Sequence, residues 1–236
     1  MSNSYFRFKQ FTIEQEGCAM KVATDGCLLG GWFDASKSRH VLDVGCGSGL
    51  ISIMAAQRCN AVIVGVEIED SAAAQAALNV SRCPWSSRID IVNCDFLQYT
   101  TQKLFDTVVC NPPYFVNSLK CDGEARSLAR HSDTLDNGAF FKKVASLLTP
   151  DGKVSIVIPC DIFEGWKDAA AINGFAASRV TFIKTTPRKA PKRVLVEFVR
   201  AYSCSTVATT LVLEDSPGVY SADACAILRD FYLKIS

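Results

Sequence analysis

Apolar residues follow two alternating spacings along most of this chain. Short apolar runs, which are typical of buried strands, recur between segments in which apolar residues return every third or fourth position, as in helices. The runs predict strands over 41–44, 61–66, 88–92, 105–110, 153–158, 175–184 and 193–201, with a further strand near 207–213. The helical segments are 49–58, 70–81, 136–148, 161–173 and Ala222–Leu233.

The residues before the first of these strands predict smaller elements. Tyr5–Phe8 and Phe11–Glu14 alternate between apolar and polar side chains, which indicates a small hairpin. Either Thr24 or Asp25 is a good N-cap for a short helix that continues to Phe33.

Alternating strands and helices predict an α/β fold with a mostly parallel, doubly wound sheet. The strands 175–184 and 193–201 have no helix between them, which indicates an antiparallel hairpin at the edge. We expect a seven-stranded sheet in a single domain over 1–236. In this domain 1–39 is an N-terminal extension that closes over the ligand site, and 40–236 is the core.

A glycine-rich turn follows the first strand of the predicted core. Gly45, Gly47 and Gly49 separate the strand 41–44 from the next helix, and such a unit lets a ligand approach the backbone at a helix N-terminus. The spacing is G-x-G-x-G, not the G-x-G-x-x-G of dinucleotide-binding proteins. Asp43, just before the turn, adds a carboxylate that suits a cationic or amino-bearing ligand.

Acidic residues also follow the second and third core strands. Glu67 is placed to accept hydrogen bonds from ribose hydroxyls, and Asp95 can receive an adenine amino group. A single acid of this kind is commonly only a solvated strand end. Ligand sites in doubly wound sheets lie beyond the carboxyl ends of the strands. We therefore expect one crevice to hold Gly47, Glu67, Asp95 and Asn111.

The tetrapeptide Asn111-Pro112-Pro113-Tyr114 follows the apolar run 105–110. Two successive prolines cannot continue a central strand, because neither offers an N–H group to the ladder. The side-chain oxygen of Asn111 and the carbonyl of Pro112 then form two acceptors for a planar –NH2 group, on which an aromatic ring can stack. Taken alone, the tetrapeptide also fits a proline-rich strand exit with a surface Tyr. The segment Phe115–Thr134 after it predicts a long loop.

Together these motifs resemble the class I S-adenosylmethionine-dependent methyltransferases. Val41–Gly49 is similar to their first motif, and the tetrapeptide is similar to the catalytic motif of the branch that methylates exocyclic or amide nitrogens. Essentially the whole chain resembles the family of bacterial tRNA1(Val) adenine-37 N6-methyltransferases. The segments that carry this second resemblance are Phe8–Phe11, Cys18–Val22, Thr24–Gly26, Leu28–Gly30, Ala73–Gln75, Lys192–Leu195, Tyr220–Ser221 and Phe231–Leu233.

The resemblance implies a Rossmann-like class I methyltransferase fold, S-adenosylmethionine as the cofactor, tRNA as the substrate and no metal. Together with the arguments above, it indicates three groups of site residues. The cofactor-binding residues are Lys21, Thr24, Asp25, Gly26, Asp43, Gly45, Cys46, Gly47, Glu67, Asp95, Phe96 and Asn111. The catalytic residues are Asn111, Pro112, Pro113 and Tyr114. The substrate-binding residues are Tyr114, Phe115, Arg188, Lys189, Lys192 and Arg193.

Three other functions share parts of this pattern. A glutamine N5-methyltransferase fits the same tetrapeptide, but such enzymes carry a helical domain before the glycine motif, where this chain has only about forty residues. A DNA adenine methyltransferase is expected to carry a target-recognition domain, and none is evident. The third is a cofactor-binding RNA chaperone without catalysis, which the intact Asn111 and Tyr114 argue against.

Composition limits the choices further. The 236 residues contain no apolar run that approaches about twenty residues and no signal peptide, so we expect a cytoplasmic protein without a membrane span. Eleven cysteines, odd in number and never spaced C-x-x-C, indicate a reducing compartment and argue against a zinc site. No obligate protein partner is indicated.

The formal net charge is only +1, so binding of a nucleic acid must depend on local clusters of cations. Lys184–Arg193 carries five cationic side chains and no acids within ten residues. Such a cluster can neutralise several phosphates, each of which adds to affinity and to its salt sensitivity. On charge alone, a solvated hairpin tip is the alternative. With the resemblance, we expect this turn to contact tRNA.

Overall fold

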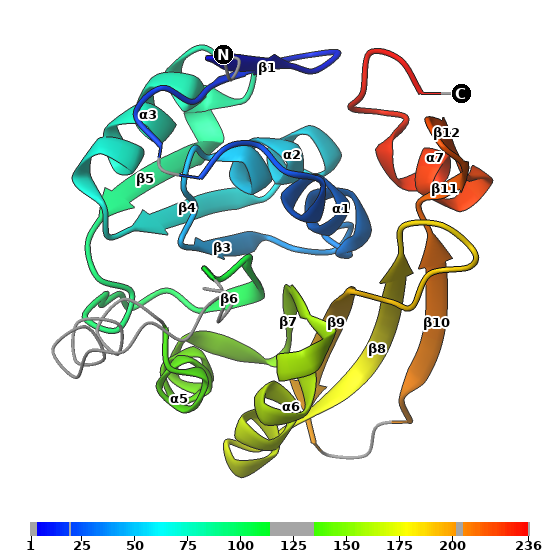
Figure 1. Ribbon diagram of the computed structural model, residues 1–236. Coiled ribbons are helices and arrows are strands. Elements are labelled where there is room, and N and C mark those ends of the chain that lie inside the picture. The colour runs from blue at the N-terminus through cyan, green and yellow to red at the C-terminus, as the bar shows by residue number, and fades with distance from the viewer. Residues whose placement is uncertain (1–3, 19, 114–134, 202–204, 236) are drawn as a thin grey trace, which may run out of the picture.

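The computed structural model describes residues 4–18, 20–113, 135–201 and 205–235 (Figure 1). Its centre is an eight-stranded sheet in the order β10-β8-β9-β7-β6-β3-β4-β5. These strands are β3 (His40–Val44), β4 (Val62–Glu67), β5 (Ile89–Asn93), β6 (Phe105–Cys110), β7 (Leu148–Pro159), β8 (Phe175–Lys184), β9 (Arg193–Arg200) and β10 (Val207–Val212). Two small hairpins join β1 (Tyr5–Arg7) to β2 (Thr12–Glu14) and β11 (Glu214–Ser216) to β12 (Val219–Tyr220).

The helices lie between these strands. They are α1 (Thr24–Trp32), α2 (Leu50–Arg58), α3 (Asp70–Ser81), α5 (Asn137–Leu147), α6 (Phe163–Ile172) and α7 (Ala222–Leu228), with short 3-10 helices at Ser86–Arg88 and Cys160–Ile162. Within the described part of the chain, no helix is both long and apolar enough to cross a membrane.

Strand directions confirm the predicted mostly parallel, doubly wound sheet. Every described neighbour pair in the main sheet is parallel except the two pairs that β9 makes, with β7 on one side and β8 on the other. The antiparallel β8–β9 pair is therefore also confirmed. The expected count of seven strands is wrong, because β10 pairs with β8 from Val207↔Arg179 to Val212↔Lys184 and adds an eighth.

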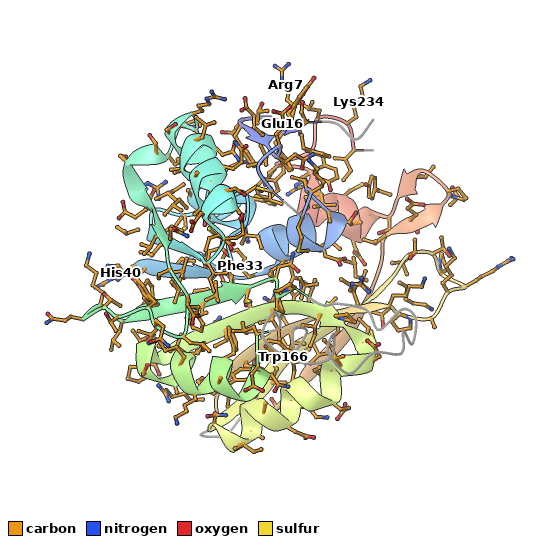
Figure 2. The ribbon with its side chains drawn as sticks, turned by 60° about the vertical axis from the view of Figure 1, so that its left-hand side comes forward. Arg7, Glu16, Phe33, His40, Trp166 and Lys234 are labelled. Atoms are coloured by element: carbon orange, nitrogen blue, oxygen red, sulfur yellow. The ribbon has the colours of Figure 1, made fainter. Side chains whose placement is uncertain are left out.

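The sheet is buried on both faces, as parallel sheets usually are. Successive residues of a strand point to opposite faces, so along β7 Val157 joins one core while Ile156 and Ile158 join the other. Helices α1, α2, α3 and α7 cover the first face, and α5 and α6 cover the second (Figure 1). Figure 2 shows Phe33 and Trp166 on the two sides of the sheet.

The N-terminal end of α1 differs from the sequence-based prediction. Its N-cap is Ala23, which has extended backbone angles and gives no side-chain cap, so the proposal of Thr24 or Asp25 as the cap is wrong. Both residues lie inside the first helical turn, where the Asp25 carboxylate faces the positive end of the helix dipole.

The C-terminal helix is shorter than predicted. α7 ends at Leu228, not at Leu233, and the N–H groups of Phe231 and Tyr232 both donate to the Leu228 carbonyl in a closing turn. Phe231 is then only 1% exposed. Burial of this ring against the core, rather than continued helix, accounts for the apolar spacing.

The predicted N-terminal hairpin is confirmed, and it packs against two distant segments. Lys9 N donates to the Phe231 carbonyl at 2.8 Å, and the Phe8 ring lies 6.0 Å from the Tyr232 ring between centroids. On the other side, Glu14 N donates to Oδ1 of Asn79 on α3 at 3.0 Å. The hairpin thereby bridges α3 and the C-terminal residues. That residues 1–39 close over a ligand site stays a prediction.

Candidate functional site

The carboxyl ends of four parallel strands meet at one edge of the sheet. Val44, the last residue of β3, is the register partner of Cys110 at the end of β6 and of Val66 near the end of β4. Glu67 is in turn paired with Asn93 at the end of β5. Because the strand order reverses on the two sides of β3, this edge is the switch point at which doubly wound sheets bind ligands.

The glycine turn leaves β3 at this edge and bends back toward β4. Gly45, Gly47 and Gly49 have φ angles of 66°, 55° and 80°, a region that side chains other than glycine rarely adopt. The N–H groups of Gly45 and Cys46 donate to the Val66 carbonyl at 2.8 and 3.1 Å. A Cβ placed on Gly45 or Gly47 would meet nothing within 4 Å, so open space lies above the turn.

Glu67 holds the turn from the neighbouring strand. Its side chain is buried, its Oε2 accepts the Gly47 N–H at 2.8 Å, and its Oε1 accepts the Glu69 N–H at 3.0 Å. A carboxylate has about four lone-pair positions, so it can accept further hydrogen bonds from a ligand. Glu67 therefore fixes the turn and offers acceptors at the same place.

Asp43 lies under the turn and is fully buried. Its Oδ2 accepts the Ser52 hydroxyl at 2.7 Å, whereas its Oδ1 has no hydrogen-bond partner among the described residues. Burial raises the pKa of Asp43 to about 7, against a smaller lowering by Ser52. A buried carboxyl with an unused oxygen is a suitable partner for a cationic or amino group.

Asp95 and Phe96 follow β5 at the same edge. Asp95 is half-buried, and its Oδ1 accepts the Leu97 N–H at 2.9 Å, which fixes the turn after the strand. Phe96 is 5% exposed and packs against Phe140 of α5, with ring centroids 5.7 Å apart. The structure thus places Asp95 where a ligand can reach it and Phe96 in the core beneath. Their roles toward a ligand stay predictions.

The predicted catalytic segment begins directly after β6. Asn111 is half-buried, Pro112 is buried and Pro113 is exposed, so the two prolines lead the chain out of the sheet as expected. A Cβ built on Gly26 of α1 would lie 3.7 Å from Asn111 Nδ2, which places the first turn of α1 against the amide. Tyr114, Phe115 and the rest of the predicted loop lie outside the described residues.

The segment before α1 runs close to Glu67. Lys21 is exposed, and its Nζ donates to the Gln15 carbonyl at 2.8 Å. Burial, followed by the nearby Glu67 carboxylate, raises the pKa of the Cys18 thiol. This segment therefore passes near a strand-end acid, and Lys21 and Thr24 on it are exposed; their roles toward a ligand stay predictions.

The basic turn between β8 and β9 contains two kinds of cation. Arg188, Lys189 and Lys192 are exposed, and their contact with tRNA stays a prediction. Arg193 instead is half-buried, and its Nε donates to Asp25 Oδ2 at 2.8 Å. The structure thus joins a predicted substrate-binding residue to a predicted cofactor-binding residue.

Two supporting residues were not identified from the sequence. Ser52 is the only described side chain that donates to the Asp43 carboxylate, and Asn79 Nδ2 donates both to the Glu14 carbonyl and to the Ser48 carbonyl of the glycine turn. Each is a lone polar residue in an otherwise apolar stretch of helix, which is the signal that could have drawn attention to it.

The site therefore offers acceptors for amino and hydroxyl groups around an open glycine turn, beside an amide and a proline carbonyl. Among the described residues, no group of three or more His, Cys, Asp or Glu side chains is arranged to hold a metal ion.

Comparison with known proteins shows to which methyltransferases the chain is similar. Residues 19–162 match the model of the methyltransferase small domain family. The chain is 46% identical over 235 residues to a tRNA1(Val) (adenine(37)-N6)-methyltransferase of Phocaeicola vulgatus, with 100% of both chains covered. It is 40% identical over 234 residues to the protein of that name from Glaesserella parasuis, with 99% of each covered.

Two solved structures share the fold at low sequence identity. A predicted O-methyltransferase from Agrobacterium tumefaciens superposes with a TM-score of 0.68 at 16% identity, over 90% of this chain and 99% of the other. A ribosomal protein L11 methylase from Lactobacillus delbrueckii gives a TM-score of 0.53 at 20% identity, over 74% and 77%. These two likenesses support the Rossmann-like fold alone.

Proposed function

The chain belongs to the family of tRNA1(Val) (adenine(37)-N6)-methyltransferases, and we propose that Asn111 and Pro112 hold the reacting nitrogen in its reaction. The protein transfers a methyl group to N6 of adenine 37 of tRNA1(Val). The observation that carries the proposal is the register of Val44 with Cys110, which sets the glycine turn and Asn111 side by side at the switch point.

The residues at this edge fit S-adenosylmethionine, which supplies a methyl group on a sulfonium centre when it is bound. Open space lies above Gly45 and Gly47, where a Cβ would meet no atom within 4 Å. The unpartnered Oδ1 of Asp43 suits the amino end of the cofactor, and the free lone pairs of Glu67 suit its ribose hydroxyls. Asp95 is assigned to the adenine amino group.

Asn111 and Pro112 act on the substrate base. Adenine N6 is a poor nucleophile because its lone pair is delocalised into the ring. The Asn111 Oδ1 and the Pro112 carbonyl each accept one N6 hydrogen, which draws the nitrogen toward tetrahedral geometry and turns its lone pair toward the glycine turn. Most of the rate gain then comes from orientation, which is worth up to roughly 7–11 kcal/mol in well-aligned reactions.

The base must leave the anticodon loop to reach this pair of acceptors. Unstacking a base from a single-stranded loop costs less than extruding one from a duplex. Tyr114 is assigned to stack on the extruded base. The exposed cations Arg188, Lys189 and Lys192 are assigned to the tRNA phosphates.

A labelled-methyl assay with bulk tRNA, rRNA, DNA and protein as parallel substrates tests this function. We expect label in tRNA alone, recovered as N6-methyladenosine by nucleoside mass spectrometry. The Asn111→Ala protein should still bind S-adenosylmethionine and should lose transfer by roughly a hundredfold or more. Asn173→Ala removes an amide that follows α6 and donates to the Ala169 carbonyl, and this matched control should keep full activity. Label in protein, or rapid turnover by Asn111→Ala, would contradict the proposal.

A further inference from the structure

Arg193 is held by an ion pair, whereas Arg188, Lys189 and Lys192 of the basic turn are exposed. It is the first residue of β9, paired in register with Pro159 of β7 and with Ile183 of β8. Its Nε donates to Asp25 Oδ2 at 2.8 Å, while the side chains are only 30% and 25% exposed. Because both side chains are half-buried, this ion pair is screened less by solvent and salt than an exposed surface pair.

The partner of Arg193 lies next to the reacting amide. Asp25 is the second residue of α1, and Gly26 follows it against Asn111, 3.7 Å from Nδ2 to a Cβ built on the glycine. The first turn of α1 has no side-chain cap, because Ala23 occupies the N-cap. Because this turn has no side-chain cap, the Asp25–Arg193 ion pair adds a tie between the turn and β9, beside the burial of Gly26 and Cys27.

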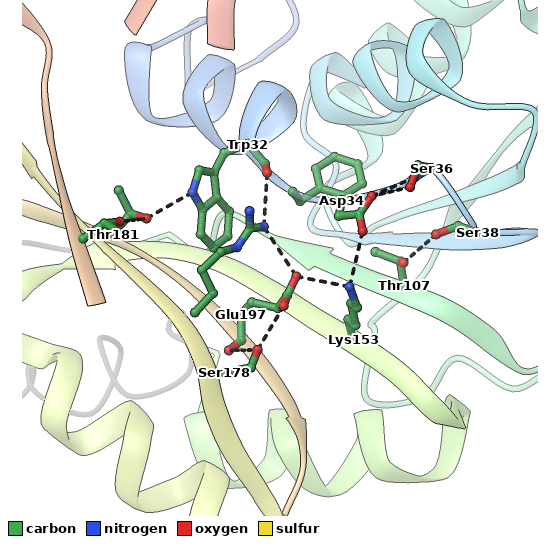
Figure 3. Close-up of polar contacts among 12 residues, drawn as sticks. Trp32, Asp34, Ser36, Ser38, Thr107, Lys153, Ser178, Thr181 and Glu197 are labelled. Atoms are coloured by element: carbon green, nitrogen blue, oxygen red, sulfur yellow. Dashed lines mark hydrogen bonds and ion pairs between the residues drawn. The ribbon is translucent and has the colours of Figure 1, made fainter. Parts of the chain in front are cut away.

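The other end of α1 is tied down independently (Figure 3). The guanidinium of Arg179 stacks on the Trp32 ring 3.7 Å from its centroid and donates to the Trp32 carbonyl at 3.2 Å. The same group contacts Glu197 Oε2 at 3.4 Å, and Lys153 joins that carboxylate to Asp34. The C-terminal end of α1 is therefore held by β8 and β9 even if the pair at its N-terminal end is lost.

We propose that Arg193 is a positioning residue that acts through Asp25 to hold the first turn of α1 against Asn111, rather than a ligand of tRNA phosphate. This inference rests on the proposed methyl transfer. The basic turn then divides into two parts. Arg188, Lys189 and Lys192 contact the substrate, and Arg193 fixes the amide that orients it. A loss of Arg193 should slow the methyl-transfer step, whereas a loss of Lys192 should weaken tRNA binding.

The first experiment compares Arg193→Gln with Lys192→Gln, two neutralisations at adjacent positions. The dissociation constant for tRNA is measured over a range of salt concentrations. Lys192→Gln should make the plot of the logarithm of the tRNA binding constant against the logarithm of salt concentration less steep, by the contribution of about one phosphate contact. Arg193→Gln should leave this slope unchanged. An equal loss of slope in the two variants would make Arg193 a phosphate ligand and overturn the inference.

The second experiment measures single-turnover transfer at saturating cofactor and tRNA. Arg193→Gln and Asp25→Asn should each lower the rate roughly tenfold, since misplacement of a reacting group by 1 Å can cost about a hundredfold. The double variant should be no slower than either single variant, because both remove the same pair. Additive losses, or unchanged rates, would refute a role through the ion pair. If Arg193→Gln does not fold, Asp25→Asn decides alone, since it removes no cation.

A third measurement needs no activity. Hydrogen exchange of the amides in 24–28 should accelerate in Arg193→Gln and stay at the wild-type rate in Lys192→Gln, while the C-terminal turn of α1 keeps its protection. Equal protection of the first turn in both variants would contradict the inference. If the wild type transfers no methyl group to tRNA, the proposed function fails, and this measurement still decides whether Arg193 holds α1.

Discussion

Replacement of Asp43 by Asn should change how the stability of the protein depends on pH. Asp43 is fully buried, accepts one hydrogen bond from Ser52 and has a pKa raised to about 7 by burial. In the unfolded chain the same carboxyl titrates near its ordinary value of 3.8. Between these two values the folded protein holds a proton that the unfolded chain has already released. Folding stability therefore falls as pH rises through this window.

The size of the effect follows from the shift. A difference of roughly three pKa units corresponds to roughly 4 kcal/mol of stability, present below the unfolded pKa and lost as pH approaches the folded one. Of this, roughly 2–3 kcal/mol falls between about pH 5 and about pH 8. An Asn at this position cannot ionise, so the part of the slope that Asp43 contributes should disappear.

Urea unfolding at several pH values measures this slope. The amide introduced by Asp43→Asn would itself be incompletely paired, so the absolute stability of this variant is not the test. The quantity to compare is the difference between about pH 5 and about pH 8, which should shrink by roughly 2 kcal/mol or more. Asp90→Asn, at an exposed position of β5, is the matched control and should keep the wild-type slope. An unchanged slope in Asp43→Asn would refute the argument that burial governs this carboxyl.

Two further predictions concern packing and the same carboxyl. Gly31→Ala should lower the free energy of unfolding by roughly 1–3 kcal/mol, because its Cβ would lie 2.6 Å from the Ile227 backbone oxygen. Gly30→Ala would contact only a flexible side chain, so it should destabilise the protein less than Gly31→Ala when the two variants are compared by thermal melting. Equal losses of stability in the two variants would contradict this reasoning. Ser52→Ala removes the hydrogen bond that lowers the pKa of Asp43, so the pH-dependent loss of stability should extend to higher pH than in the wild type. If the loss of stability in Ser52→Ala instead ended at a lower pH than in the wild type, this prediction would be wrong.

Elements whose ends are set by local chemistry could be predicted closely. The ranges 70–81 and 105–110 match α3 and β6 in the structure. Glu69 caps α3 by accepting the Ala72 N–H at 2.8 Å, and the prolines after Asn111 end β6. In the first place the sequence contains the signal that begins the element, and in the second the signal that ends it.

Ends set by distant packing could not be predicted. The apolar spacing of Leu228, Phe231 and Tyr232 imitates a helix, yet the last two rings turn toward the core and the N-terminal hairpin. The small β11–β12 hairpin was missed because its strands over Glu214–Ser216 and Val219–Tyr220 are too short for an alternating pattern. Both the end of α7 and the presence of this hairpin depend on tertiary packing, which no local pattern contains.

In the candidate site, too, features set by local sequence could be predicted and features set by distant packing could not. Strand-end residues such as Glu67 and Asp95 could be placed because parallel strands bring their carboxyl ends to one edge. The pairing of Asp25 with Arg193 joins residues 168 positions apart, and no local pattern contains it. The same holds for Ser52, whose contact with Asp43 depends on how α2 packs on β3.

The contact between the two ends of the chain has a consequence for synthesis. Lys9 donates both its backbone N–H to Phe231 and its Nζ to the Arg229 carbonyl, 220 positions away. A ribosome makes the hairpin first and its covering residues last, so Phe8 stays without this cover for most of translation. The N-terminal hairpin can therefore complete its packing only after the C-terminal residues have emerged from the ribosome. In ribosome-bound chains that stop before Arg229, the N-terminal hairpin should therefore be accessible to proteases.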